Sequence, residues 1–329
     1  MKAFLKKVIV FAGILLLISI TTILYLPNLA IDNSLYFALL DKHKHLKQHK
    51  APRIILLGGS NLSFGINSKT IEDSLKIPVI DMGLHAGLGL KYICLDIIDN
   101  VGPGDIVALC PEYCHFFDDE EKVFLGSEEL IYVLFDVYPE GRKCIDLKQR
   151  LHLFRFLPKY VAEKIYYFPK YALKKTSQNE VPDESNIVYL RNSFNEYGDV
   201  VAHYDLENQN FIPNVYCNNL NKETFLFLNE FNERIKQKGG EILFFYPAYN
   251  KKAYELNSSY ITNANNQLKS TLDIEFMSPE IDGIMDDSCF FNTEYHLNKT
   301  GVEIRSQQFI EQFRKLNETR TQKSKSKQL

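Results

Sequence analysis

Ser60 is the residue that the surrounding sequence best prepares for chemistry. It follows the aliphatic run 54–57 and two glycines, Gly58 and Gly59. Four consecutive aliphatic residues indicate a strand that is buried on both faces. A serine on the turn after such a strand presents its hydroxyl at the carboxyl edge of the sheet, and flanking glycines let backbone amides approach a substrate oxygen. The pattern predicts a nucleophile, although Gly-Gly-Ser-Asn also occurs in ordinary turns.

A serine hydroxyl is a poor nucleophile until a base takes its proton, and histidine is the most common base. Of the eight histidines in the chain, His296 is the one expected in a loop between the last strand and the last helix. In a parallel sheet such a loop lies at the carboxyl edge, where ligands bind. We therefore expect Ser60 and His296 to share one edge of the sheet.

Alternating strands and helices must position these two residues. The expected strands cover 53–57, 78–82, 106–110, 242–246 and, more weakly, 272–276. The expected helices begin near Asn67 and near 90, and then cover 222–238, 251–270 and 299–316. This alternation favours a parallel sheet covered by helices. We predict a three-layer α/β/α domain over 51–316, with a five-stranded parallel sheet of flavodoxin-like type.

Three segments fall outside this pattern. Residues 115–220 are rich in aromatic side chains and too long for a plain loop between two core strands, so we predict a folded lid, with a tight turn at 195–199. Residues 31–50, with a basic and histidine-rich run, are expected to be a solvated linker that touches anionic headgroups. The polar tail 317–329 is expected to be disordered.

The amino-terminal stretch Val8–Leu26 has no charged residue and approaches the roughly 20 residues that cross a bilayer as a helix. Three lysines precede it, and the first charge after it is Asp32, so the positive-inside rule places the amino terminus in the cytoplasm. A cleaved signal peptide is the alternative, but Leu26–Ala30 is a poor cleavage site. We expect residues 1–30 to be an uncleaved anchor.

The composition argues against several other functions. A net charge of −3 gives no case for nucleic-acid binding, which needs a concentrated basic surface. The six cysteines are scattered, and Cys110, Cys114 and His115 are too few for a metal site. Lysines interleave the three histidines of 41–50, which also argues against a metal there. We expect buried free thiols and neither a metal nor an organic cofactor.

The layout resembles the SGNH/GDSL hydrolase family over about 51–114 and 221–316. Gly58-Gly59-Ser60-Asn61 matches the first family block, except that Gly59 stands where aspartate is usual. Gly83 matches the second block, a glycine whose amide helps to bind the oxyanion, and His296-Leu297-Asn298 with Gly301 matches the last. The closest resemblance is to membrane-anchored envelope proteins of polysaccharide O-acetylation and teichoic acid D-alanylation.

Two family positions differ in this chain. The third block should carry glycine-x-asparagine, whereas the chain has Pro111-Glu112-Tyr113. The resemblance therefore implies an oxyanion hole made by the amides of Ser60 and Gly83, with Asn61 or Tyr113 helping. Thr293 stands where the family has the aspartate of the triad. Asn292 can orient the imidazole through its side-chain carbonyl, and the nearby carboxylates are alternatives: Glu294, Asp286 and Asp287.

His85 and Glu112 also follow strands on the same edge. For His85 a structural role is favoured over substrate contact. Glu112 is expected either to bind a sugar hydroxyl or to hold the lid, and Tyr113 is a further candidate for substrate contact.

These features predict a membrane-anchored serine acyl-esterase or O-acyltransferase outside the cytoplasm. The expected substrate is an acyl ester, with acetyl the expected group, on a cell-envelope or exported glycan. Ser60 would attack the acyl carbonyl and His296 would take its proton. The partners would be the membrane, the glycan and, as a further option, a membrane acyl-transfer protein. Two alternatives stay open: a catalytically lapsed glycan-binding module, and a plain lipase or esterase.

Overall fold

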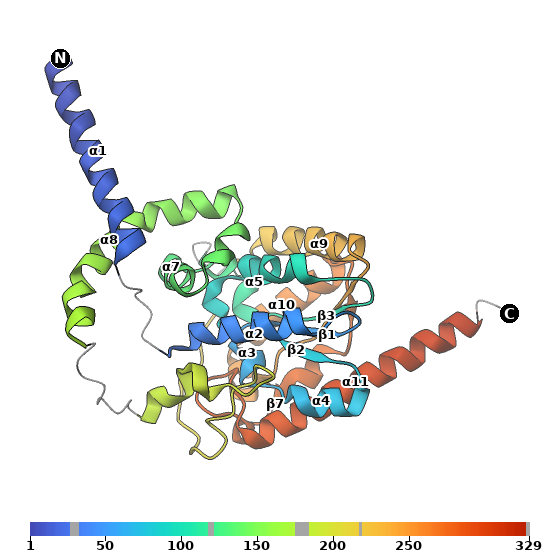
Figure 1. Cartoon of the computed structure of the whole chain (residues 1–329). Coiled ribbons are helices and arrows are strands. Elements are labelled where there is room, and N and C mark those ends of the chain that lie inside the picture. Colours follow the sequence, from blue (N-terminus) through green and yellow to red (C-terminus); the bar gives the residue numbers. More distant parts are fainter. Residues whose placement is uncertain (27–32, 118–121, 175–183, 217–218, 327–329) are drawn as a thin grey trace. The chain divides into compact units, whose positions relative to one another are not determined.

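The computed structural model describes residues 1–26, 33–117, 122–174, 184–216 and 219–326. The chain forms two compact units (Figure 1). The first comprises Met1–Asp32 and Glu128–Asp183, and the second comprises Asn33–Ser127 and Glu184–Leu329. Cys217 and residues 27–32, which include most of the segment judged a poor cleavage site, lie outside the described residues.

A five-stranded parallel sheet forms the centre of the second unit, which confirms the predicted α/β class. Its order is β2-β1-β3-β4-β6. The strands are β1 Ile54–Gly58, β2 Val79–Asp81, β3 Ile106–Cys110, β4 Glu241–Phe244 and β6 Glu275–Phe276. The fifth strand is only two residues long and lies at the edge. The chain changes direction across the sheet between β1 and β3, and ligands bind outside the carboxyl ends of strands at such a switch point.

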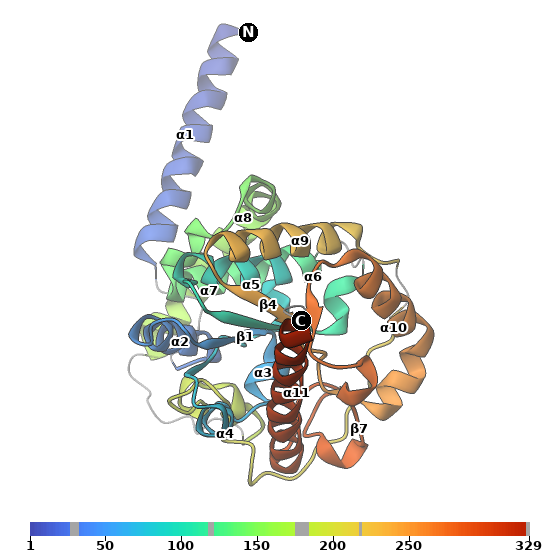
Figure 2. The same ribbon diagram turned by 90° about the vertical axis from the view of Figure 1, so that its right-hand side faces the viewer.

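Helices cover both faces of this sheet (Figure 2). On one face Ile54 and Leu56 of β1 pack in a cluster with Phe309 and Phe313. The helices there are α4 Ser68–Leu75 and α11 Lys299–Ser326, and those on the other face are α5 Leu90–Ile97 and α9 Lys222–Gln237. Residues 54–57 of β1 are all aliphatic because both faces of this central strand are buried. α10 Lys251–Thr271 packs beside a small second sheet, β5 Tyr249–Asn250 with β7 Ile284–Met285.

Asparagine side chains begin four of these helices. The side-chain oxygens of Asn67, Asn221, Asn250 and Asn298 each accept a hydrogen bond from a backbone amide in the first turn of the following helix. Such caps satisfy amides that the helix itself leaves unpaired. The predicted starts of α4 and α11 are therefore correct.

The predicted solvated linker is wrong over most of its described length. Residues Ala38–Gln48 form helix α2, which belongs to the second unit. Lys42 and His43 are buried in it. Each has an acidic partner: Asp81 Oδ2 lies 3.5 Å from Lys42 Nζ, and Asp96 Oδ2 lies 2.8 Å from His43 Nε2.

The predicted disordered tail is wrong as far as Ser326, where α11 ends. The guanidinium of Arg320 pairs with Glu241 on β4 and Glu275 on β6, at 2.8 and 2.6 Å. These ion pairs tie the polar end of α11 to the edge of the sheet. Residues 327–329 lie outside the described part.

The segment between β3 and β4 is divided between the two units. The second unit contains α6 Lys122–Leu125 and two 3-10 helices, η6 Glu184–Tyr189 and η7 Arg191–Ser193. The predicted tight turn follows them, with Gly198 at φ +96°, a left-handed conformation that favours glycine. The first unit contains α7 Glu128–Val137 and α8 Leu147–Lys174.

The first unit also contains α1, Lys2–Tyr25, which is long and apolar enough to cross a membrane. Its 24 residues span about 36 Å as an α-helix, against about 30 Å for a hydrocarbon core. Helix α8 packs against α1 and against α7.

Candidate active site

Ser60 opens the short helix α3, Ser60–Ser63, directly after β1. The two glycines before it allow close packing at the strand end. A Cβ on Gly58 would lie 2.3 Å from the carbonyl oxygen of Cys110, and one on Gly59 would lie 2.6 Å from Glu112 Oε1. The first contact is with backbone, so glycine at position 58 is required for β1 and the end of β3 to approach this closely, whereas a side chain at position 59 would displace the Glu112 carboxylate.

His296 lies within hydrogen-bond distance of Ser60. The distance from His296 Nε2 to Ser60 Oγ is 2.9 Å, and Nδ1 lies 2.8 Å from Asn292 Oδ1. Asn292 Nδ2 donates to the Tyr189 hydroxyl at 2.9 Å, which directs its carbonyl oxygen toward the imidazole. Nδ1 therefore carries the proton, and the lone pair of Nε2 faces the serine hydroxyl.

The turn before α11 holds this geometry. Thr293 Oγ1 accepts hydrogen bonds from the amides of Tyr295 and His296, and Phe291 N donates to the carbonyl of His296 at 2.8 Å. The ring of Phe64 stacks on the imidazole with 4.1 Å between centroids and 9° between planes. Thr293, at the position of the family's acid, thus shapes the turn, and Asn292 contacts the imidazole.

The carboxylates named as alternatives to Asn292 have other partners. Glu294 Oε1 accepts from the side-chain amide of Asn214 at 2.6 Å. Asp287 pairs with Lys252 and accepts from Asn250 Nδ2. Asp286 precedes the 3-10 helix Asp287–Cys289, and no contact joins it to His296.

Burial decides the charge state of His296, which is only 6% exposed. Desolvation lowers the pKa of its imidazole to about 3, with His203 and His85 adding to the effect. The ring is therefore neutral over the physiological range and can accept a proton. Its imidazolium is costly, because Asn292 offers a dipole rather than a negative charge.

Glu112 lies on the other side of Ser60, after β3. Its Oε1 is 3.2 Å from Ser60 Oγ and accepts a hydrogen bond from the Asn61 amide, also at 3.2 Å. Burial is the main reason that the pKa of this carboxyl is raised to about 7; the hydrogen bonds from Asn61 and Ser60 oppose the rise, and the charge of Glu294 adds to it. Ser60 and Glu112 stand on either side of the switch point between β1 and β3.

The predicted oxyanion donors are only partly free. The Gly83 amide donates to Asp81 Oδ1 at 2.7 Å, which removes it from the predicted set. The Asn61 side chain donates a hydrogen bond to Cys110 and accepts one from the Gly59 amide, so it is not free to bind an oxyanion. The backbone amide of Asn61 donates to Glu112 Oε1. Among the described residues the Ser60 amide has no hydrogen-bond acceptor.

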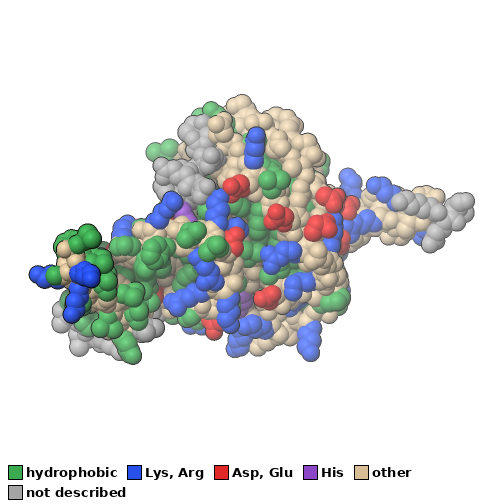
Figure 3. All heavy atoms as spheres, turned by 90° about the horizontal axis from the view of Figure 1, so that it is seen from above, with side chains coloured by type: hydrophobic (Ala, Val, Ile, Leu, Met, Phe, Trp, Pro, Cys, Tyr) green, Lys and Arg blue, Asp and Glu red, His purple; other side chains and the backbone are tan. Residues whose placement is uncertain are grey.

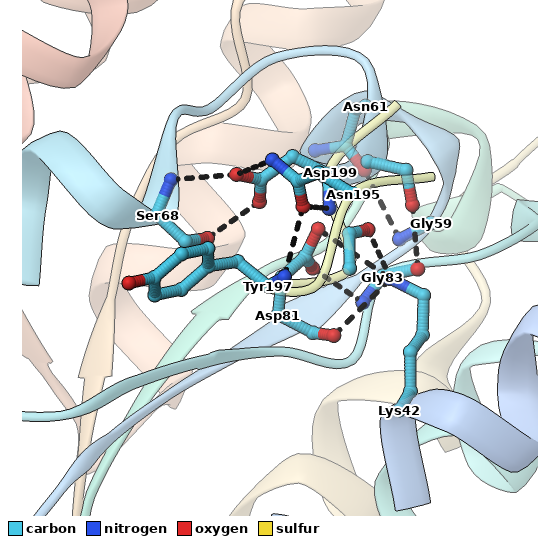
Figure 4. A network of polar contacts seen from close by, with 11 residues as sticks. Lys42, Gly59, Asn61, Ser68, Asp81, Gly83, Asn195, Tyr197 and Asp199 are labelled. Atoms are coloured by element: carbon cyan, nitrogen blue, oxygen red, sulfur yellow. Dashed lines mark hydrogen bonds and ion pairs between the residues drawn. The ribbon is translucent and has the colours of Figure 1, made fainter. Parts of the chain in front are cut away.

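A buried polar network holds the strand ends behind the site (Figure 4). Lys42 Nζ donates to the carbonyl oxygens of Asp81 at 3.1 Å and Gly198 at 2.6 Å. Asp199 accepts from the Ser68 amide at 2.9 Å. Burial lowers the pKa of Lys42 and raises those of Asp81 and Asp199. The network fixes α2, β2 and the 195–199 turn to one another.

Ser60 and His296 open into a cavity of about 470 Å³. Glu112 and His85 also line it, and His85 Nδ1 accepts from the Gly87 amide at 2.9 Å. The remaining lining residues are Leu35, Tyr36, Phe64, Leu84, Ala86, Cys114, Val188, Tyr189, Phe194, Asn214, Thr293, Glu294 and Tyr295. Tyr113 is not among them, because it is buried edge-on against Tyr249.

Sequence reasoning missed Tyr189, Phe64 and Tyr36 as parts of the site. Tyr189 and Tyr36 lie in segments without a helix or strand period, so no pattern marked them. In the described part of the chain, no group of His, Cys, Asp and Glu gathers as metal ligands.

No family model matches the chain, and no curated protein matches it. The chemistry is therefore inferred from the residues themselves. A serine, a neutral imidazole and an amide carbonyl in hydrogen-bonded series can perform nucleophilic attack on an acyl group.

Proposed function

We propose that the chain is a serine acyl-esterase or O-acyltransferase of the SGNH/GDSL type, acting outside the cytoplasm on a cell-envelope or exported glycan. The observation that carries this proposal is the 2.9 Å contact between Ser60 Oγ and His296 Nε2, with Asn292 behind the imidazole. In this proposal α1 anchors the chain in the membrane, with its amino terminus in the cytoplasm.

The proposed reaction has two stages. Ser60 Oγ bonds to the acyl carbon while its proton moves to His296 Nε2, and the resulting imidazolium then protonates the leaving sugar oxygen as the ester bond breaks. Water or a sugar hydroxyl next gives its proton to His296 and attacks the acyl-serine, which restores the free serine.

The Ser60 amide and a protonated Glu112 are the proposed donors to the oxyanion. With a pKa near 7, Glu112 is largely neutral in mildly acidic solution, and a neutral carboxyl can donate a hydrogen bond. It stands after β3, one residue before Tyr113, which is at the position where the family has asparagine. The Glu112 carboxylate occupies part of the space that a side chain at Gly59 would need.

The lining of the cavity supports a glycan rather than a simple aliphatic ester. Tyr36 and Tyr189 supply aromatic surface, and Asn214, Glu294 and His85 supply polar groups beside Ser60. Tyr189 and Asn214 come from the segment between β3 and β4, and we propose that this segment forms a lid. An acceptor held there would favour transfer over hydrolysis, since proximity can replace several kcal/mol of chemical activation.

The second candidate is a glycan-binding module whose catalytic site has lapsed. The occupied Gly83 amide and the amide rather than carboxylate behind His296 favour it. Such a module would keep the cavity and bind glycan without turning over an ester.

The test compares acetate release from an aryl acetate with acetyl transfer to a glycan acceptor. We expect Ser60→Ala and His296→Ala to reduce both to background, while Ser258→Ala, an exposed serine on α10, leaves both unchanged. Undiminished turnover in the Ser60 variant would remove the serine mechanism. Glycan binding by a parent protein with no turnover would favour the lapsed module.

A further inference from the structure

An exposed apolar stripe runs along α8. Leu147, Leu151, Phe154 and Ile165 are 71, 61, 68 and 48% exposed. Their spacing of four, three and eleven residues places them on one face of an α-helix. Single exposed apolar side chains are ordinary, but several large ones on one face of a long helix mark a contact surface.

Basic residues accompany the stripe. Helix α8 carries seven lysines and arginines and a single acidic residue, Glu163. Lys164 is buried and paired with Asp136, whereas Arg155 lies exposed next to Phe154. Figure 3 shows lysine and arginine side chains among the hydrophobic ones in the region of α1 and α8. A cationic helix with an exposed apolar face is typical of segments that lie in a membrane interface.

The contact between α8 and α1 gives this surface a location. The two helices pack together within the first unit, and Thr22, near the carboxyl end of α1, is only 5% exposed. In the proposed topology that end of α1 leaves the bilayer on the outer side. In this topology the contact of α8 with α1, if made at the buried end of α1, lies at the level of the outer headgroups.

We propose that α8 lies on the outer leaflet of the membrane that α1 spans, with its apolar stripe in the acyl boundary and its basic residues on anionic headgroups. This inference rests on the anchoring part of the proposed function and is independent of the catalytic part. With α8 docked, the first unit contacts the membrane through two helices. Binding of α8 depends on the charge of the lipid headgroups, whereas insertion of α1 does not.

The chain contains no tryptophan, so a single introduced tryptophan reports its own depth. The full chain would be placed in nanodiscs of anionic lipid with brominated acyl chains, which quench tryptophan at membrane depth. Three variants are compared: Leu16→Trp in α1, Leu151→Trp in α8 and Leu226→Trp in α9. Leu151 and Leu226 are both 61% exposed, so Leu226 is the matched control.

We expect brominated lipid to quench the emission of the Leu16 and Leu151 variants by about half or more and to leave the Leu226 variant unchanged. Adding Arg155→Glu should weaken quenching at position 151 in anionic discs, whereas Lys251→Glu on α10 should not.

Quenching at position 16 without quenching at 151 would overturn the docking of α8 and leave the anchor standing. No quenching at either position would overturn both. A third outcome would also overturn the proposal. If brominated lipid does not quench the tryptophan at position 151, but its protection from acrylamide increases with protein concentration, a second copy of the chain covers the stripe. Ester turnover of the same variants in detergent reports separately on the catalytic site.

Discussion

At the scale of single residues, the amide behind His296 determines what kind of base the imidazole is. In a serine protease, replacing the triad aspartate by asparagine lowers turnover by about 10⁴ because the wrong tautomer forms. Here the Asn292 NH₂ group donates to the Tyr189 hydroxyl, so the Asn292 carbonyl oxygen faces His296 Nδ1. This arrangement favours the His296 tautomer with the proton on Nδ1, which leaves Nε2 free to accept the serine proton. The remaining cost is the missing negative charge beside the imidazolium.

Asn292→Asp should supply that charge. The carboxylate would raise the pKa of His296 from its low value and stabilise the imidazolium, so we expect labelling of Ser60 by a fluorophosphonate to accelerate about 10- to 100-fold. Rate constants for labelling of the parent, Asn292→Asp and Asn292→Ala measure this. The alanine variant should be slower than the parent. An aspartate variant no faster than the parent would show that position 292 does not assist the base.

Glu112 should give the reaction an upper pH limit. Its pKa is raised to about 7, so below that pH it is neutral and can donate to the oxyanion, and above it the carboxylate cannot. His296 is neutral throughout, since its pKa is lowered to about 3. We expect the labelling rate to fall about tenfold per pH unit well above pH 7.

The matched variant is Glu112→Gln, which donates at every pH. The labelling rate of this variant should stay flat from pH 6 to 9. The other groups that face the cavity, Glu294, Cys114 and His85, are the same in both proteins, so a difference between the two pH profiles reports on Glu112. A decline above pH 7 in both proteins would assign the limit to another group. A parent rate that rises with pH would show that Glu112 acts as the carboxylate.

Sequence motifs were informative about Ser60 and His296 because strand-end and loop positions follow from hydrophobic patterning. Asn292 could be named as an orienting residue but not chosen over the nearby carboxylates. The loss of the Gly83 amide to Asp81 could not be foreseen, because it depends on one side-chain orientation. Tyr189 lies in a segment without periodicity and carries no local signal.

At the scale of elements, the long strands and the caps at Asn67 and Asn298 were predictable, whereas α2 was not. Its charged composition indicates a solvated segment, but Lys42 is 2% exposed. Lys42 is satisfied by Asp81, 39 positions away, and by the Gly198 carbonyl, 156 positions away. Pairing at such separations is invisible to local patterns. The polar end of α11 was misjudged for the same reason, since its ion-pair partners lie on distant strands.

Removing Lys42 should destabilise the second unit strongly. Lys42→Met leaves the Asp81 carboxylate buried without its cation, and breaking a buried pair in this way costs about 3–5 kcal/mol. Lys42→Met combined with Asp81→Asn should recover part of that loss, since the buried charge is gone and the asparagine oxygen can still accept from Gly83. Denaturant unfolding of the purified chain in detergent measures both. A double variant as unstable as the single one would contradict a charge-based role.

At the scale of the whole molecule, the two units differ in what they contain. The first contains the helix suited to cross a membrane and the exposed apolar stripe of α8, and the second contains the parallel sheet with Ser60 and His296 at its carboxyl edge. The α/β class and the apolar amino-terminal helix were predictable from composition and period. The division of 115–220 between the units was not, because it depends on which distant segments those helices contact.

The central claim is that Ser60 is a nucleophile activated by His296. Its most direct measurement is mass spectrometry of the full chain after reaction with a fluorophosphonate, with the adduct located by peptide fragmentation. We predict one adduct, on Ser60, that forms slowly in the parent and is absent from Ser60→Ala and from His296→Ala. An adduct at another serine, or an unlabelled parent in which Asn292→Asp also fails to react, would contradict the account.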